Sequence, residues 1–315
     1  MFFGLEEALR RYDDGVHDEG AAASAAAVHA AESRLGKLPD ALGKLYRRWN
    51  GLRLFLDSFV IWPLAEVQVT EVRGQPALLV GEALGGPLWV DPSGRILVAG
   101  DDGESVCAGS DLEAFLQATL VREAYLVDKQ GEWRDVFDGD ELTEEVRRKR
   151  ARAGRKADPG AASWLLETAE LAFDDGDEGA AQVALETAVK CDPLAGGAWA
   201  LLAGLLLRGG HAAEAERAFA TAAAATVDAE LRARRWAEAA RAAAVAGHDP
   251  AGHRAAVVTA SAASPAAWRA EAEARNTDGD VDGALQLAEL AAAAGDEEAR
   301  ALVRLLRARR SLRVV

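Results

Sequence analysis

The spacing of hydrophobic residues changes near the middle of the chain. Before residue 140, branched and aromatic residues form short runs bounded by Gly, Pro and Asp, which is typical of strands. These runs are 52–56, 59–62, 77–80, 88–90 and 96–98. After residue 160, Ala-rich segments carry apolar residues three and four positions apart, which indicates amphipathic helices. The pattern predicts an α+β domain followed by an all-α domain.

Helical patterns flank the predicted strands. Apolar residues share one face over 5–12, and 21–34 is rich in Ala. Pro39 fits the start of a third helix, where its missing N–H costs nothing, and Asn50-Gly51 fits its end. Ser110 is the expected N-cap of a helix that follows the last strand.

The second half of the chain repeats itself with an offset of 34 residues. Leu165 aligns with Trp199, and Trp236 and Trp268 fall in the same column. Small residues recur at fixed places between these aromatic positions, so two antiparallel helices can pack closely in each unit. Gly marks the turn within a unit, and Pro marks the joint between units.

This repeat resembles the tetratricopeptide repeat. The resemblance implies four helix pairs near 161–194, 196–229, 233–264 and 265–296, with a terminal capping helix over 297–313. Proteins of this type bind peptides or protein surfaces in a groove lined by the first helix of each pair. The residues expected to face that groove are Glu170, Phe173, Arg208, Arg241, Arg269 and Asn276.

An ordered set of short motifs over residues 20–120 resembles the SUKH superfamily. The motifs are Leu35-Gly36-Lys37-Leu38-Pro39-Asp40, Leu45-Tyr46, Asn50-Gly51, Trp62-Pro63-Leu64, Gly86 to Asp91, Ser110-Asp111-Leu112 and Phe115-Leu116. The resemblance implies a sheet with flanking helices and a role in binding rather than catalysis. Bacterial members of this superfamily typically neutralise toxins by direct contact.

The charge of the chain narrows the choice of partner. The formal net charge is −15 and the pI is about 4.9, which argues against nucleic acid and anionic membranes as partners. Residues 1–140 carry a net −11, whereas 141–160 carry a net +3 and read as a basic linker. Asp101, Asp102 and Glu104 form an acidic turn, interpreted as solvated or as part of an acidic binding face.

No set of residues in the sequence predicts a cofactor, a metal ion or a catalytic site. Cys107 and Cys191 fit neither a disulfide scaffold nor a zinc ribbon. The segment Asp278–Glu289 matches a calcium-loop pattern, but the repeat makes Gly279 a turn between helices and places Glu289 inside the second one. His248 and His253 are interpreted as parts of a polar turn, because no third metal ligand is evident.

The sequence thus predicts a non-enzymatic interaction protein with a SUKH-like domain over 1–140, a basic linker over 141–160 and helical repeats over 161–315. The leading hypothesis is an immunity-type protein that binds a basic toxin domain or holds a peptide in the repeat groove. The alternative is a cytoplasmic scaffold that recruits a client through the repeats, and an enzyme with a site in the N-terminal cleft ranks last. Without a signal peptide or an apolar run of about 18 residues, the expected location is the cytoplasm.

Overall fold

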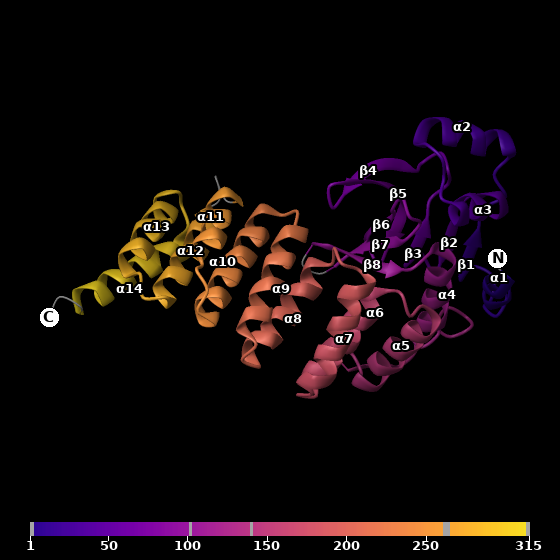
Figure 1. Ribbon diagram of the computed structural model, residues 1–315. Coiled ribbons are helices and arrows are strands. Elements are labelled where there is room, and N and C mark those ends of the chain that lie inside the picture. Colours follow the sequence, from indigo (N-terminus) through magenta and orange to yellow (C-terminus); the bar gives the residue numbers. More distant parts are fainter. Residues whose placement is uncertain (1–2, 101–102, 139–140, 261–264, 313–315) are drawn as a thin grey trace. The chain divides into compact units, whose positions relative to one another are not determined.

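A computed structural model describes residues 3–100, 103–138, 141–260 and 265–312 (Figure 1). The chain forms two compact units, Met1–Pro193 and Leu194–Val315. The first unit holds the sheet and seven of the described helices, and the second is entirely helical in its described part.

The sheet of the first unit is antiparallel throughout. Its strands run in the order β1-β2-β3-β5-β6-β7-β8, and β4 pairs with β5 outside this path. Their bounds are β1 His17–Glu19, β2 Leu52–Leu54, β3 Phe59–Ile61, β4 Gln68–Val72, β5 Gln75–Ala83, β6 Gly86–Val90, β7 Ile96–Ala99 and β8 Ser105–Gly109. A separate two-stranded ribbon joins β9, Phe137–Asp138, to β10, Glu141–Leu142.

Strand β5 changes partner along its length. Its first half pairs with β4 from Gln75 to Leu79, and its second half pairs with β3 from Gly81 to Ala83. The register with β6 shifts between Leu79 and Gly81. A Cβ at Gly81 would lie 1.8 Å from the Val60 carbonyl oxygen, so only glycine admits this approach.

All five predicted strand runs are found, but β1, β4 and β8 were not predicted. Strand β4 lies at a sheet edge and has mostly polar, exposed residues, and β8 is built mainly from small residues. Neither carries the branched and aromatic run that identifies a buried strand.

Helices cover the sheet and bury its core. They are α1 Phe3–Leu9, α2 Ala25–Leu35, α3 Asp40–Arg48, α4 Leu112–Glu123, α5 Glu144–Ala157, α6 Ala162–Asp174 and α7 Glu178–Cys191. The largest fully buried side chains include Tyr46 of α3, Phe115 of α4 and Ile96 of β7. Burying such side chains contributes roughly 2–3 kcal/mol each.

Two of the predicted helix ends are wrong. The N-cap of α4 is Asp111 rather than Ser110, because the Asp111 carboxylate accepts a hydrogen bond from the Ala114 N–H at 2.9 Å. Ser110 instead donates its own N–H to Asp158 at 2.7 Å. Helix α3 is capped by Trp49 in extended conformation, one residue before Asn50-Gly51.

Most of the expected basic linker is helix α5. Arg150 of this helix is buried and donates to Glu123 of α4 at 2.8 Å. Asp158 follows α5, and Asp192, 34 residues later, follows α7. Both carboxylates are buried and accept backbone N–H groups at the end of the sheet, from Ser110 and Cys107. The predicted domain boundaries at 140 and 160 stay a prediction, whereas the compact units divide at 193.

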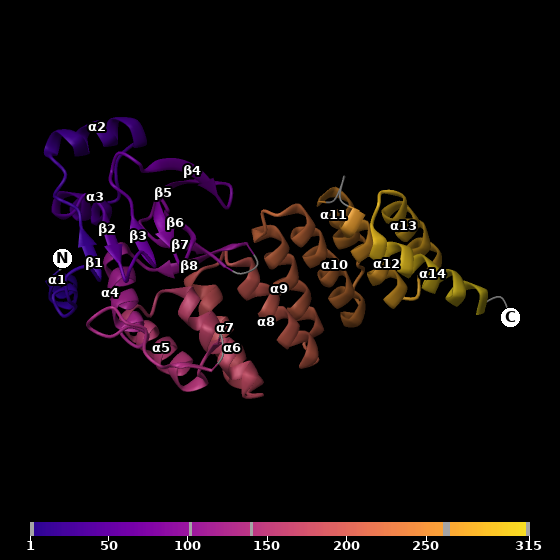
Figure 2. The same ribbon diagram turned by 180° about the vertical axis from the view of Figure 1, so that it is seen from behind.

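In its described part, the second unit consists of consecutive helices (Figure 2). They are α8 Gly196–Arg208, α9 Ala212–Ala225, α10 Ala229–Ala246, α11 Ala251–Ala260, α12 Pro265–Thr277, α13 Val281–Ala293 and α14 Glu297–Leu312. Fully buried alanines such as Ala203, Ala215 and Ala222 let α8 and α9 pack closely. The expected all-helical region is therefore found, whereas its division into four repeat units and a capping helix stays a prediction. Among the described helices, none combines the length and the apolar character that a membrane span requires.

Candidate functional site

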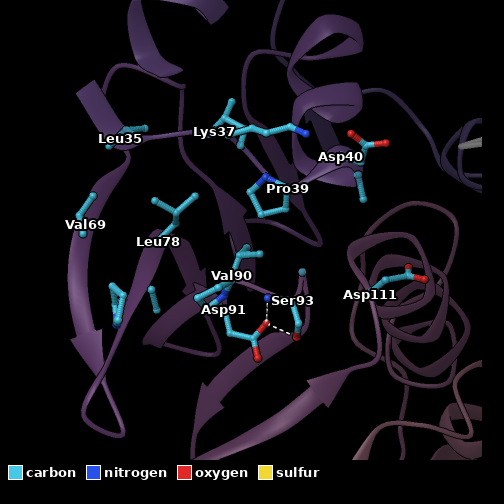
Figure 3. A pocket seen from close by; sticks show the side chains of 16 residues that line it. Leu35, Lys37, Pro39, Asp40, Val69, Leu78, Val90, Asp91, Ser93 and Asp111 are labelled. Carbon is cyan, nitrogen blue, oxygen red and sulfur yellow. Dashed lines mark hydrogen bonds between the residues drawn. The ribbon is translucent and has the colours of Figure 1, made fainter. Parts of the chain in front are cut away.

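A pocket of about 730 Å³ opens in the first unit (Figure 3). Its apolar wall is the face of the sheet formed by Val69 of β4, Leu78 of β5 and Val90 of β6. The loop 35–41 and the turn 91–94 form the remaining walls, and Asp111 lies at one side. The pocket thus combines four segments that are far apart in the sequence.

The loop between α2 and α3 is held over the pocket by local features of its sequence. Gly36, with φ +83°, ends α2 and redirects the chain. Pro39 precedes the first turn of α3, and Leu38 between them is 3% exposed and anchors the loop in the core. Lys37 and Asp40 therefore lie on the solvent side of the loop.

Asp91 holds the turn between β6 and β7. Its carboxylate accepts hydrogen bonds from Ser93 N–H at 2.8 Å and Ser93 Oγ–H at 2.6 Å, and from Arg95 N–H at 3.0 Å and Nε–H at 2.8 Å. Burial raises the pKa of Asp91, but these hydrogen bonds outweigh it and keep the pKa below its ordinary value. The carboxylate is therefore ionised, and its hydrogen bonds stabilise the turn.

The rim of the pocket carries more negative than positive charge. Asp40 is exposed and lies 3.8 Å from Lys44, Asp111 caps α4, and Asp91 faces the turn. Lys37 is the cation of the rim, and it forms no ion pair with any residue that the structure describes. The residues that line the pocket include neither His nor Cys. Ser93 Oγ donates to the ionised Asp91, so no activated nucleophile is assembled there.

One wall of the pocket is an open sheet edge. Within the described strands, β4 pairs with β5 alone. Val69, near its start, is 54% exposed and lines the pocket. The unpaired edge of a strand presents N–H and C=O groups that an added strand could satisfy.

Of the three residues of the predicted acidic turn, the structure describes only Glu104. Asp101 and Asp102 lie outside the described residues. Glu104 is half-buried directly before β8, and its carbonyl oxygen accepts the Gly100 N–H at 2.6 Å. Glu104 does not line the pocket, so that prediction points to another part of the sheet.

The predicted groove residues all lie on the first helices of pairs, but several have partners within the chain. Glu170 is exposed and Phe173 is half-buried on α6, and Arg208 is exposed at the end of α8. Arg241 pairs with Glu238 at 2.5 Å, and Arg269 pairs with Asp296 at 3.0 Å and Glu298 at 2.7 Å. Asn276 accepts hydrogen bonds from Arg309 at 2.6 and 3.1 Å. The role of these residues in partner binding stays a prediction.

The acidic residues of the calcium-loop pattern are spread over separate ion pairs. Asp278 contacts Arg254, Asp282 lies 3.2 Å from Arg310, and Glu289 lies 2.8 Å from Arg307. Asp280 caps α13 by accepting the Gly283 N–H. In the described part of the chain, no three His, Cys, Asp or Glu residues are placed to hold a metal ion.

Sequence reasoning identified His248 and His253 as parts of a polar turn in the second unit but missed their partner, Glu216. Glu216 of α9 contacts His248 Nδ1 at 2.6 Å and His253 Nε2 at 2.9 Å, and the His253 ring stacks on Trp236. Burial raises the pKa of Glu216, but the two histidines outweigh it and lower the pKa. Glu216 is 32 residues before His248, which is close to the 34-residue offset of the repeat. This spacing is the feature of the sequence from which the contact could have been predicted.

No protein-family model matches the sequence, and no curated protein matches it. The chain is similar to the structure titled "Functional Characterization of Pseudomonas Aeruginosa pilF", with 16% identity and a TM-score of 0.40, over 55% of this chain and 82% of that one. It is also similar to MamA, with 20% identity and a TM-score of 0.38, over 50% of this chain and 94% of that one. Matches of this strength assign neither a family nor a function, and none of them bears on the SUKH resemblance.

Proposed function

We propose that this chain is a non-enzymatic protein-binding adaptor whose first unit receives an extended segment of a partner protein. The observation that carries this proposal is the continuity of the apolar pocket with the open edge of β4. A ligand there gains two kinds of contact, because the edge offers backbone hydrogen bonds and the pocket accepts a side chain.

The orientation of Val69 in β4 defines how such a segment would bind. Val69 lies on the pocket side and is largely exposed, so an added strand next to it places every second side chain over the pocket. The floor of Leu78 and Val90 accepts an apolar side chain. Burial of one such side chain contributes roughly 1.5–3 kcal/mol.

The charges of the rim favour a segment with a basic residue beside the apolar one. Asp40 and Asp111 stand at the pocket, and the chain as a whole carries a net −15. This charge attracts a basic partner over long distance and accelerates encounter.

A more specific function within this proposal is that of an immunity-type protein that neutralises a basic toxin, as the SUKH resemblance implies. The alternative is a scaffold that recruits a client through the helix pairs. Co-expression with the product of the adjacent gene separates the two forms. Rescue of growth from a toxic product supports immunity, whereas unchanged lethality counts heavily against it.

The adaptor function itself is tested with a random peptide library displayed against the full chain. We expect enrichment of an apolar residue flanked by Lys or Arg in an extended segment. An enriched peptide should bind the Val69→Lys variant at least about tenfold more weakly, because the new cation blocks the pocket wall and repels the basic peptide. Leu84→Asn is the matched control, since Leu84 is 66% exposed in the next turn and does not line the pocket. Failure to enrich any sequence, or equal binding by the Val69→Lys variant, refutes the proposal.

A further inference from the structure

The first unit contains a second cavity, of about 360 Å³, whose electrostatic character is opposite to that of the pocket. It lies between the residues just after α1, one face of α4 and the loop that follows α4. Its apolar wall consists of Leu120 and Val121 of α4 and of Ala124, the C-cap of this helix. Val121 is 47% exposed, so this wall is open to solvent.

Three cations surround this apolar wall: Arg11, Lys129 and Arg134. Arg134 Nε donates to the Val127 carbonyl oxygen at 3.3 Å, and its backbone N–H donates to the Leu126 carbonyl oxygen at 2.7 Å, so the residue is held in place. The backbone carbonyl of Lys129 accepts the Asp13 N–H at 2.8 Å, which fixes the loop against the end of α1. Neither Lys129 nor Arg134 forms an ion pair with any described residue.

The cavity lining holds one carboxylate, Asp128, against its three cations. Asp128 lines the cavity, but its Oδ1 accepts the N–H groups of Gln130 at 2.9 Å and Glu132 at 3.0 Å. Glu123 is buried and pairs with Arg150. Glu7 pairs with Arg11 at 3.1 Å, which leaves the other two cations to a ligand.

We propose that this second cavity binds an apolar carboxylate, in which a negative charge and a branched aliphatic group are carried on one carbon atom. Lys129 and Arg134 would hold the carboxylate, and the α4 wall would cover the aliphatic group. The volume suits one or two amino-acid residues and excludes a helix. A free small acid and the last residue of a peptide chain both have this chemistry.

An exposed aromatic residue stands next to the cavity. Trp133 is 58% exposed and pairs in an antiparallel bridge with Val127, which lines the cavity. Residues paired across such a bridge point to the same side. The indole is therefore placed to contact residues that precede the carboxylate of a peptide.

The test is a titration of the full chain, labelled with ¹⁵N, with N-acetyl-leucine and with N-acetyl-leucinamide. We expect the acid to shift the amide signals of Val121, Ala124 and Val127, and the amide to bind about tenfold more weakly. Lys129→Gln and Arg134→Gln should each weaken binding of the acid about fivefold or more. Lys190→Gln is the matched control, because Lys190 is an exposed cation on α7 of the same unit. No shifts at the cavity, or equal binding of acid and amide, overturns the proposal.

A second arm distinguishes the two sources of the ligand. The peptide acetyl-Ala-Ala-Leu is compared with N-acetyl-leucine. Tighter binding of the peptide, with a shift of the Trp133 indole signal, supports a peptide terminus. Equal affinity supports a free small acid. Neither result depends on the pocket at β4. A negative result here therefore leaves the proposed adaptor function standing, and a negative result in the peptide-library test leaves this proposal standing.

Discussion

At the scale of single residues, the local sequence predicts a feature only where its physical cause is also local. Pro39 and Gly36 bound the loop over the pocket, and both were identified as parts of a motif in the sequence. The N-cap of α4 was misassigned to Ser110 because Ser and Asp are both good caps. Asp158, 48 residues away, binds the Ser110 N–H, and no local pattern contains that contact.

Gly81 is a residue whose identity is dictated by a distant strand. Gly81→Ala should destabilise the protein by about 3 kcal/mol or more, because the new Cβ meets the Val60 carbonyl oxygen. Gly43→Ala is the control in the same unit, since the nearest atom to its new Cβ is 3.8 Å away inside helix α3. This substitution should be neutral or stabilise by up to about 1 kcal/mol. Urea denaturation measures both, and equal effects would refute the explanation.

His17 makes the stability of the first unit depend on pH. Burial among aromatic rings lowers its pKa from 6.5 to about 4, so the folded state favours the neutral form. The unfolded chain binds a proton between these two values and the folded chain does not, so stability falls as pH decreases from about 6.5 to 4. Allowing for partial exposure, the loss is roughly 2 kcal/mol.

The variant His17→Gln tests this dependence. Gln does not titrate and keeps an acceptor for the Phe55 N–H, which contacts His17 Nδ1 at 3.3 Å. Free energies of unfolding measured at pH 7.5 and pH 5 should differ less in this variant than in the wild type. His29→Gln, at an exposed position on α2, should leave the difference unchanged. A steep dependence in His17→Gln would contradict the assignment.

At the scale of elements, periodicity predicts helices well and edge strands poorly. The predicted helix pairs fall on α6 to α13, because an Ala-rich packing face repeats over many turns. Strands β4 and β8 are short and lack that redundancy. The segment that forms helix α5 was expected to be a basic linker, because its charged sequence gives no sign that Arg150 is buried against Glu123. Strand β4 matters most here, because it forms the open edge of the pocket.

Asp192, at the end of helix α7, connects this helix to the sheet through an ion pair and a hydrogen bond. Its buried carboxylate pairs with Arg73 at 2.7 Å and accepts the Cys107 N–H of β8 at 2.9 Å. Asp192→Ala should cost about 3–5 kcal/mol, since it leaves Arg73 buried without its partner. The Cys107 amide should also exchange faster with solvent. Asp177→Ala, which removes the exposed N-cap of the same helix, should cost only about 1 kcal/mol and leave the Cys107 amide protected.

At the scale of the whole molecule, composition and the pattern of hydrophobic residues predict that an α+β region precedes an all-α region. They do not predict the site. The change from strand runs to Ala-rich helices is present in the sequence, and both kinds of structure are found in that order. The pocket is assembled from the loop 35–41, Val69, the segment 76–78, the segment 90–94 and Asp111, and only the folded sheet brings these together. The predicted binding residues were chosen by their place on the first helices of the repeats and, for the acidic turn, by charge. Neither criterion identifies a pocket that distant segments assemble.

The central claim is that β4 and its pocket receive an extended segment of a protein partner. Hydrogen–deuterium exchange of the full chain, with and without the peptide selected from the library, tests it most directly. Binding should slow exchange within Gln68–Val72 and in the loop 37–41, with no such change in the Val69→Lys variant. Protection confined to the helices of the second unit, with β4 exchanging as fast as in the free chain, would contradict it.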